Sequence, residues 1–382
     1  MRRVPRTIVV SALSATGFFN LACLPVDAQT VRAEWRGSMP LETTTTDQHG
    51  QAFTVTGLSG LTMMDSSRFV AVMDNSDKLV FVEVEWNPDG SIRSAAITGG
   101  FTIAEARDFE GIAYTTAERD SVFLAEEGTP AIHEYALADG ALLQSLESPP
   151  VFGNRRANFG FESLARRPGG SELWTANEEA LMVDGDRSTP QHGTVVRLLR
   201  YARAGNAATP AEQFAYVTEP MHGGAITGGR SGLVELVALP NGGVLALERS
   251  FAFRFPNLFE SRLYELDFAG ASDVSDFGNG LIGETYTPVT KHLLWSGDVG
   301  NLEGLALGPR LASGNRALLG IVDDGDPLSR NQLVAFELIG SFAIGMKPAA
   351  RAECLPPTDV QSAIDDGAAA VVLRLFDFLQ NR

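Results

Sequence analysis

The pattern of apolar and polar positions repeats five times along the chain. Each copy is a short apolar run, a reversal rich in Gly, Pro, Asn or Ser, and a second apolar run that ends in acidic or amide residues. This pattern predicts two antiparallel β-strands joined by a turn. The five copies are 57–65 before 69–75, 108–113 before 122–127, 160–165 before 173–179, 232–240 before 244–250, and 301–309 before 317–326.

The spacing of the copies predicts the fold. Their leading polar residues are Ser59, Glu110, Glu162, Glu235 and Glu303, separated by 51, 52, 73 and 68 residues. A strand-built repeat near 50 residues, lengthened twice by insertions, is typical of a β-propeller. We therefore expect an all-β chain forming a single β-propeller of five or six blades. Six is favoured, because the residues after position 28, once the long insertion is discounted, suffice for about six blades of 40–50 residues.

Further segments complete the predicted domain. Alternating runs at 131–137, 141–148, 195–202, 262–268 and 332–339 predict outer blade strands, and terminal strands are expected to close the ring. The insertion 184–230 predicts long inter-blade loops, and 359–382 has the spacing of a short C-terminal helix. The expected organisation is a signal peptide at 1–28, a propeller domain at 29–350 and a helical tail at 351–382.

Hairpin geometry predicts a site. The first strand of a hairpin starts where the second ends, so the leading glutamates should meet the strand-end residues at one mouth of the central channel. Several carboxylates gathered there are unfavourable unless a cation neutralises them. The expected metal ligands are Glu110, Glu162, Glu235, Glu303, Asp323 and Asp324, and the expected catalytic residues are Glu178, Glu248 and Arg249.

The ligand chemistry narrows the choice of cation. Only five histidines are present, which argues against a histidine-rich zinc centre, whereas carboxylate and amide oxygens favour Ca²⁺, with Mg²⁺ second. On this hypothesis, changing Glu248 or Asp324 to its amide weakens metal binding and abolishes hydrolysis. The alternative is that the leading glutamates bond backbone amides and tie neighbouring blades together.

Composition and motifs exclude several functions. The net charge of −17 argues against nucleic acid and anionic membranes as partners. The chain contains no G-x-S-x-G elbow, no P-loop and no C-x-x-C pair. A small anionic or ester substrate and a monomeric protein remain the expectation.

The N-terminus has the pattern of a secretory signal. Arg2, Arg3 and Arg6 precede a short apolar stretch that is too broken for a membrane span, and cleavage after Ala28 is expected. The protein is therefore predicted to be exported, either periplasmic or secreted, by the Sec or the twin-arginine route. Lipid attachment at Cys23 is an alternative. Without Cys23, Cys354 is the only cysteine, so no internal disulfide is expected.

The ordered motifs resemble a known family. D-x-E-G-I-A, N-x-G-F-E-S-L-A, T-A-N-E-E-A-L, L-E-R-S, R-L-Y-E-L-D and N-L-E-G-L-A occur between about Leu58 and Leu338. In this order they resemble the phytase-like family of exported bacterial proteins, described as having esterase-like activity. The resemblance implies a β-propeller related in shape to the calcium-dependent propeller phytases, and it implies phosphoester or ester hydrolysis. It assigns no catalytic residues.

Three functions follow as alternatives. The first is a metal-assisted hydrolase of phosphoesters or other esters, in which Glu178 or Glu248 accepts a proton from water and Arg249 stabilises negative charge. The second is a lactonase-like calcium propeller whose ion is held by Asn177 and the acidic ring. The third is a non-catalytic binding or scaffold propeller with a structural cation.

Overall fold

The computed structural model describes residues 31–340, apart from 224–227, 254–256 and 325–329. The predicted signal peptide, Cys23, Cys354 and the predicted C-terminal helix lie outside the described residues. Within them the chain is built almost entirely of strands, with one short 3-10 helix, η1 (Pro150–Asn154). Among the described residues, no helix has the length and apolar character needed to cross a membrane.

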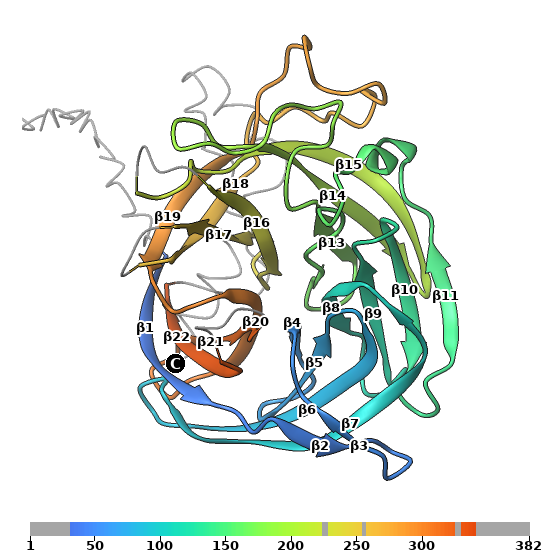
Figure 1. Ribbon diagram of the computed structural model, residues 1–382, viewed down its shortest axis with the longest axis vertical. Coiled ribbons are helices and arrows are strands. Elements are labelled where there is room, and N and C mark those ends of the chain that lie inside the picture. The colour runs from blue at the N-terminus through green and yellow to red at the C-terminus, as the bar shows by residue number, and fades with distance from the viewer. Residues whose placement is uncertain (1–30, 224–227, 254–256, 325–329, 341–382) are drawn as a thin grey trace, which may run out of the picture. The chain divides into compact units, whose positions relative to one another are not determined.

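Five four-stranded antiparallel sheets surround a central channel (Figure 1). In the first four blades the strands follow one another from inside to outside, as alternating apolar runs and tight turns dictate. Their bounds are β4 (Leu58–Met63), β5 (Arg68–Met73), β6 (Ser76–Trp86) and β7 (Ile92–Arg107); β8 (Phe109–Tyr114), β9 (Ser121–Glu126), β10 (Ala131–Ala136) and β11 (Leu142–Leu146); β12 (Ala165–Arg166), β13 (Glu172–Ala176), β14 (Val195–Ala204) and β15 (Ala207–Val217); and β16 (Gly229–Ala238), β17 (Val244–Ala252), β18 (Phe259–Asp267) and β19 (Thr290–Gly297).

The fifth blade joins the two ends of the domain. Its inner strands are β20 (Leu302–Arg310), β21 (Arg316–Val322) and β22 (Gln332–Ile339), and its outermost strand is β1 (Arg32–Pro40). β1 pairs antiparallel with β22, with Arg32 opposite Ile339 and Pro40 opposite Gln332. The expected closure by terminal strands is therefore confirmed. A separate two-stranded sheet, β2 (Thr44–Thr46) with β3 (Ala52–Thr54), precedes the first blade.

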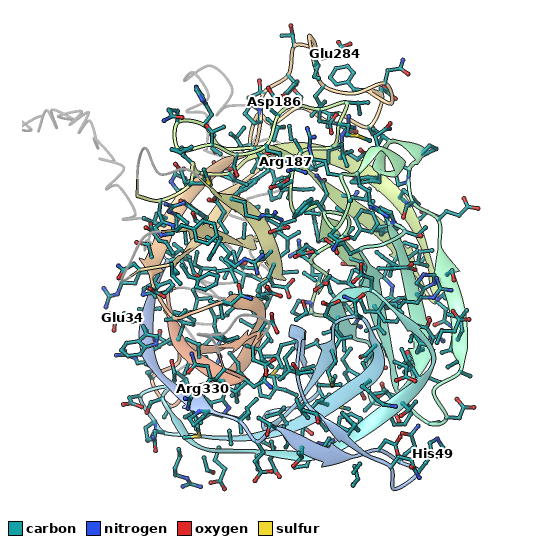
Figure 2. The ribbon with its side chains drawn as sticks, in the orientation of Figure 1. Glu34, His49, Asp186, Arg187, Glu284 and Arg330 are labelled. Carbon is teal, nitrogen blue, oxygen red and sulfur yellow. The ribbon has the colours of Figure 1, made fainter. Side chains whose placement is uncertain are left out.

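The five predicted hairpins are all present, but the preference for six blades was wrong. The described residues form five blades, because the extra length lies in loops rather than in a further sheet. The insertion 184–230 is likewise only partly loop, since β14 and β15 occupy 195–217. The second long loop, 268–289, bonds to the first through Leu281 N, which donates to Val183 O at 3.2 Å. Figure 2 labels Asp186 and Glu284 in these two loops.

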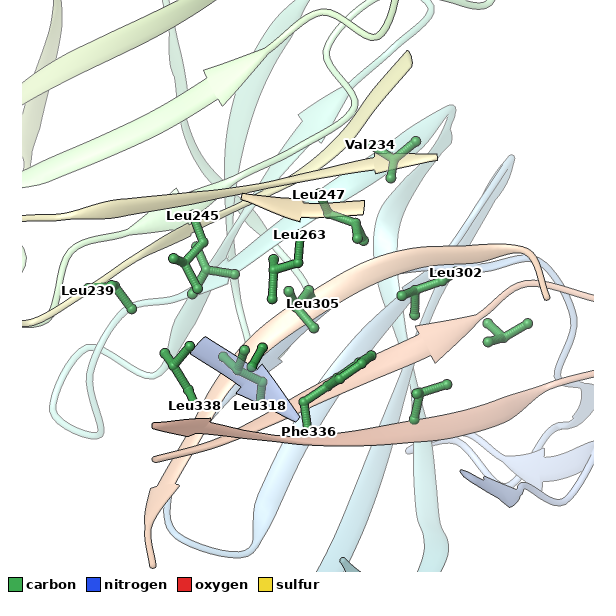
Figure 3. Packing of buried hydrophobic residues seen from close by; sticks show 14 residues of the cluster. Val234, Leu239, Leu245, Leu247, Leu263, Leu302, Leu305, Leu318, Phe336 and Leu338 are labelled. Atoms are coloured by element: carbon green, nitrogen blue, oxygen red, sulfur yellow. The ribbon is translucent and has the colours of Figure 1, made fainter. Parts of the chain in front are cut away.

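The blades are held together by apolar layers between neighbouring sheets. Between the fourth and fifth blades, Leu245, Leu263, Leu305, Leu318 and Phe336 belong to one buried cluster (Figure 3). Alternating side chains of each strand supply these layers, because successive residues point to opposite faces of a sheet. The packed blades fix the inner strands around the channel, and those strands carry the candidate site.

Candidate functional site

Each inner strand contains an extra residue near its start. The pairing with the second strand shifts between Leu58 and Leu61, between Phe109 and Ile112, between Leu233 and Glu235, and between Leu302 and Gly304. The third blade shows the same offset, since five residues from Phe161 to Ala165 face four from Trp174 to Asn177. Such β-bulges bend a strand and redirect a side chain. The redirected positions, here called the first-strand ring, are Ser59, Glu110, Glu162, Val234 and Glu303.

The residue after each ring position lies where neighbouring inner strands come close together, and in three blades it is a glycine. A Cβ atom at Gly60, Gly111 or Gly304 would overlap the backbone of the neighbouring inner strand. In the fourth blade this position is Glu235. Its Oε1 accepts hydrogen bonds from Leu164 N at 3.2 Å and Leu236 N at 2.9 Å. Burial raises the pKa of Glu235 well above its ordinary value, although these backbone bonds oppose the shift. Glu235 therefore ties two blades together instead of joining the ring.

A second ring comes from the ends of the second strands. In the first three blades, a backbone N–H at the end of the second strand donates to a backbone carbonyl at the start of the first strand. These bonds are Asp74 N to Gly57 O at 2.7 Å, Glu127 N to Asp108 O at 2.8 Å and Glu178 N to Gly160 O at 3.2 Å. Asp323 N bonds to Asn301 O at 3.0 Å in the same way, and Arg249 is paired with Gly232. These matching backbone positions define the second-strand ring, which consists of Asp74, Glu127, Glu178, Arg249 and Asp323.

Carboxylates crowd the side of the channel formed by the first three blades. Asp74, Asp108 and Glu110 form one group, and Glu110, Glu127 and Glu162 form another. Within each group one oxygen per residue lies within 4.8 Å of the others, and Glu110 belongs to both groups. Glu110, Glu127 and Glu162 are buried, whereas Asp74 and Asp108 are partly exposed. The groups thus run from the mouth into the channel.

This crowding makes ionisation unfavourable in the absence of a cation. Burial raises the pKa of Glu110 and Glu162 well above the ordinary value, and neighbouring carboxylates add to the effect. Burial and the charges of Asp108 and Glu178 raise the pKa of Glu127 to about 8. Burial, together with a hydrogen bond to Asp108, raises the pKa of Asp74 to about 6. Like charges and desolvation act in the same direction here.

The donor set fits a hard cation. Oε2 of Glu162 is buried and has no hydrogen-bond partner within the described part of the chain. A buried oxygen of this kind usually has a partner, so its position beside Glu110 and Glu127 suits a ligand that supplies positive charge. All the nearby donors are carboxylate oxygens, which Ca²⁺ and Mg²⁺ prefer.

The opposite side of the rings is neutralised by the protein itself. Arg249 donates to Glu178 Oε1 at 3.0 Å, to Asn301 Oδ1 at 2.8 Å and to Glu303. Ser59 Oγ links the two sides, because it bonds Glu110 and also reaches Glu303 Oε2 at 3.2 Å. Burial raises the pKa of Glu178, while the Arg249 charge opposes that shift.

Six of the nine predicted site residues are therefore brought together: Glu110, Glu162, Glu178, Arg249, Glu303 and Asp323. Glu235 is not among them. Glu248 points away from the channel, and it accepts hydrogen bonds from Tyr216 at 2.6 Å and Lys291 at 2.5 Å. Alternation along β17 explains this, because Arg249 takes the channel side. Asp324 instead accepts from Thr56 Oγ1 at 2.7 Å and Gly57 N at 2.9 Å, which joins the fifth blade to the first.

Other candidates from the sequence have structural partners. The Asn177 side chain accepts from Arg197 N at 3.0 Å and donates to Glu179 O. A neighbouring acid, Asp184, is buried in an ion pair with Arg197 at 2.7 Å.

The metal-ligand prediction omitted Asp74, Asp108 and Glu127. The sequence contains a signal for each of them. Asp74 and Glu127 follow the second apolar runs where Glu178 does, and Asp108 precedes Glu110 by two residues. A comparison of equivalent positions in all five hairpins would have found them.

Comparison with protein families gives one match. The model of the phytase-like family, described as "Esterase-like activity of phytase", matches residues 54–326. These residues include all five hairpins that build the two rings. Among curated proteins, no relative matches the sequence.

Several solved structures are similar at low identity. Hydrazine synthase of Kuenenia stuttgartiensis is 14% identical over 71% of this chain and 78% of its own, with a TM-score of 0.37. A luciferin-regenerating enzyme is 10% identical over 84% of this chain and 99% of its own, with a TM-score of 0.35. The periplasmic gluconolactonase of Pseudomonas aeruginosa is 11% identical over 83% of this chain and 100% of its own, with a TM-score of 0.34. Likenesses at this level carry no argument about activity.

Proposed function

The chain belongs to the phytase-like family, and from this premise we propose that it is a metal-assisted hydrolase of phosphoesters or other esters. The observation that supports the proposal most directly is the carboxylate cluster at one mouth of the channel, with its buried, unpartnered Glu162 oxygen. A small anionic or ester substrate would reach this mouth, and the protein would act as a monomer.

Glu110, Glu127 and Glu162 would hold the ion, with Asp74 and Asp108 nearer solvent. Ca²⁺ is the proposed ion and Mg²⁺ the second choice, because every donor is an oxygen. When bound, such an ion polarises the phosphoryl or acyl oxygen of a substrate.

The chain's own residues would supply proton transfer and charge stabilisation. The Glu178 carboxylate lies beside Glu127 and Glu162 and would accept the proton of the attacking water. Arg249 holds Glu178 in place at 3.0 Å and would stabilise negative charge that develops on the substrate. Glu248 has no such role in this proposal, because Tyr216 and Lys291 engage its carboxylate away from the channel.

The lactonase-like alternative is less well supported. It requires the Asn177 side chain as a ligand, and that side chain is bonded to backbone groups of Arg197 and Glu179. Lactones therefore enter the test as one arm and not as the proposed substrate. Export is also proposed, from the signal pattern of residues 1–28. N-terminal sequencing of the purified protein should then start near Gln29.

The decisive experiment measures hydrolysis of phosphomonoesters, phytate, carboxylic esters and lactones by purified protein, each with Ca²⁺ or with EDTA. Glu162→Gln is compared with Glu235→Gln. Both are buried glutamates with raised pKa values, Glu162 just before β12 and Glu235 in β16, but only Glu162 faces the carboxylate cluster.

We expect hydrolysis of at least one ester class that requires Ca²⁺, is lost in Glu162→Gln and persists in Glu235→Gln. Loss of at least about 100-fold is expected if a ligand to a catalytic ion is removed. Hydrolysis that is equal in EDTA and in Ca²⁺ would overturn the metal-assisted proposal. Absence of activity toward every class would favour a binding or scaffold propeller.

A further inference from the structure

The other end of the channel has a different character. Beyond the rings, the inner strands line an apolar cavity of about 270 Å³, whose walls include Leu61, Met63, Ile112, Leu236 and Leu307. None of the acidic residues of the two rings contributes to its wall. This cavity therefore offers space for an uncharged group.

A polar groove adjoins the cavity between the second and third blades. The groove has a volume of about 520 Å³, and its walls include Arg119, Arg166, Gly170 and Arg203. Thr115, Thr116 and Arg166 line both the groove and the apolar cavity. The two spaces thus meet at Arg166.

A separate groove of about 470 Å³ lies on the fourth blade. The fourth-blade groove differs from the groove at Arg166 in how its basic residues are paired. Its basic residues are neutralised, since Lys291 pairs with Glu248 at 2.5 Å and Arg262 pairs with Glu260 at 2.9 Å.

Two of the arginines of the groove at Arg166 have no carboxylate partner. The Arg166 side chain forms no hydrogen bond and no ion pair with any described residue, and its Nε is buried without a partner. Arg203 donates only to carbonyl oxygens, of Gly170 at 3.1 Å and Gly205 at 3.5 Å, and its Nε is also buried and unpartnered. Arg119, by contrast, is paired with Glu134.

The two unpaired guanidinium groups approach each other. A Cβ atom on Gly170 would contact Nη2 of Arg166 and Nη1 of Arg203, so both groups lie around the same glycine. Burial lowers the pKa of Arg166, and the neighbouring charge of Arg203 lowers it further. Adjacent, partly buried cations are unfavourable unless an anion lies between them. Glu118 also lines the groove and the charge of Glu134 acts on Arg203, but neither carboxylate forms an ion pair with Arg166 or Arg203 among the described residues.

We propose that this end of the channel binds an amphiphilic anion. Arg166 and Arg203 would hold its oxyanion head, because guanidinium groups bind phosphate or carboxylate through paired hydrogen bonds. The apolar part of the ligand would enter the cavity lined by Met63 and Leu307, which begins at Arg166. This site lies at the opposite end of the inner strands from the carboxylate cluster and does not depend on the proposed hydrolysis.

Calorimetric titration in EDTA tests the proposal. The probes are octyl phosphate, octanoate, inorganic phosphate and octanol, so that the head and the chain are varied separately. We expect both amphiphilic anions to bind at least about tenfold more tightly than inorganic phosphate or octanol, since each of these lacks one group of contacts. The two anions distinguish a phosphate head from a carboxylate head.

Variants assign the contacts. Arg166→Gln and Arg203→Gln should each weaken octyl phosphate about tenfold or more, through loss of a charge-assisted hydrogen bond. Arg93→Gln, which removes an exposed arginine paired with Glu85, is the matched control and should bind normally. Met63→Gln should weaken octyl phosphate while leaving inorganic phosphate unchanged. Melting temperatures establish that each variant is folded.

Two results would overturn the proposal. One is unchanged affinity for octyl phosphate in the folded double variant Arg166→Gln, Arg203→Gln. The other is equal affinity for octyl phosphate and inorganic phosphate, which would remove the apolar cavity from the site. Either result leaves the calcium-dependent hydrolysis test unaffected, because the titration is made in EDTA.

Discussion

Two sides of the same pair of rings balance their charge differently. On one side Arg249 lies between Glu178 and Glu303, with Asn301 completing its hydrogen bonds. On the other side Asp74, Asp108, Glu110, Glu127 and Glu162 form no ion pair with a basic residue in the described part of the chain. Both sides come from equivalent positions in the blades, so the difference is one of side chains and not of backbone.

The comparison shows how a repeated fold produces an asymmetric site. The bulges and strand ends recur in all five blades, but the fourth blade carries Val234 and Arg249 where its neighbours carry acids. One arginine therefore supplies the positive charge on one side. The other side is left with a net negative charge that suits an exchangeable cation.

The largest expected effect comes from removing the positive charge of Arg249, which leaves both sides of the rings without a basic residue. Arg249→Gln leaves buried Glu178 and partly buried Glu303 without their cation, and it should lower the free energy of unfolding in EDTA by about 3–5 kcal/mol. Urea denaturation measures this loss. Added Ca²⁺ should restore part of it, because the released carboxylates become possible ligands. A loss below about 1 kcal/mol would show that the Arg249 side is not neutralised as described.

The next effect is that of removing the cation from the acidic side. Chelation should lower the melting temperature, and added Ca²⁺ should restore it. At a free Ca²⁺ concentration 100 times the dissociation constant, bound Ca²⁺ should raise the free energy of unfolding by about 2.7 kcal/mol. Scanning calorimetry with EDTA and with Ca²⁺ measures the difference. Glu162→Gln should reduce the response, while Glu235→Gln should keep it. A wild-type melting temperature indifferent to both additions contradicts the metal centre.

A smaller effect is expected from acids outside the rings. Glu248→Gln weakens the bond to Lys291, and Asp324→Asn weakens the link to Thr56; each should cost about 0.5–2 kcal/mol of stability. The calcium response should remain that of the wild type in both variants. This expectation replaces the sequence-based one, in which either amide removes metal binding. A calcium response lost in Glu248→Gln would restore the earlier assignment.

The smallest effect concerns a carboxylate neutralised away from the channel. Burial alone would raise the pKa of Glu134, but hydrogen bonds from Arg119, Ser121 and Gln144 outweigh it and hold that pKa below its ordinary value. Its contribution to stability is therefore present above pH 4.5 and is lost as the pH falls through the folded-state pKa. Unfolding free energies between pH 7 and 3 should fall less steeply in Glu134→Gln than in the wild type. Equal slopes would contradict this.

The sequence was sufficient to predict the five hairpins and part of the two rings. Alternation and turn residues placed Glu110 and Glu303 at strand starts, as the structure has them. Glu162 and Glu178, predicted at a strand start and a strand end, lie just outside β12 and β13, and Arg249 lies within β17. The blade count could not be obtained in this way, because the loops at 184–194 and 268–289 lengthen two copies as much as extra strands would.

The remaining errors have a common cause in local geometry. Each bulge shifts the alternation by one residue, so Val234 occupies the ring position and Glu235 the position between blades. Glu248 and Arg249 are adjacent in β17, and only one of them can face the channel. A pattern of apolar and polar residues does not reveal which of two neighbouring polar side chains a bulge directs inward.

The pairing of β1 with β22 has a consequence for assembly. The first described strand completes the sheet begun by the last, so the ring closes only when segments some 300 positions apart have met. Until then the outer edge of β22 is an open row of backbone donors and acceptors. A second copy could supply its own β1 to that edge, which makes exchange of this strand the natural route to dimers during refolding at high concentration.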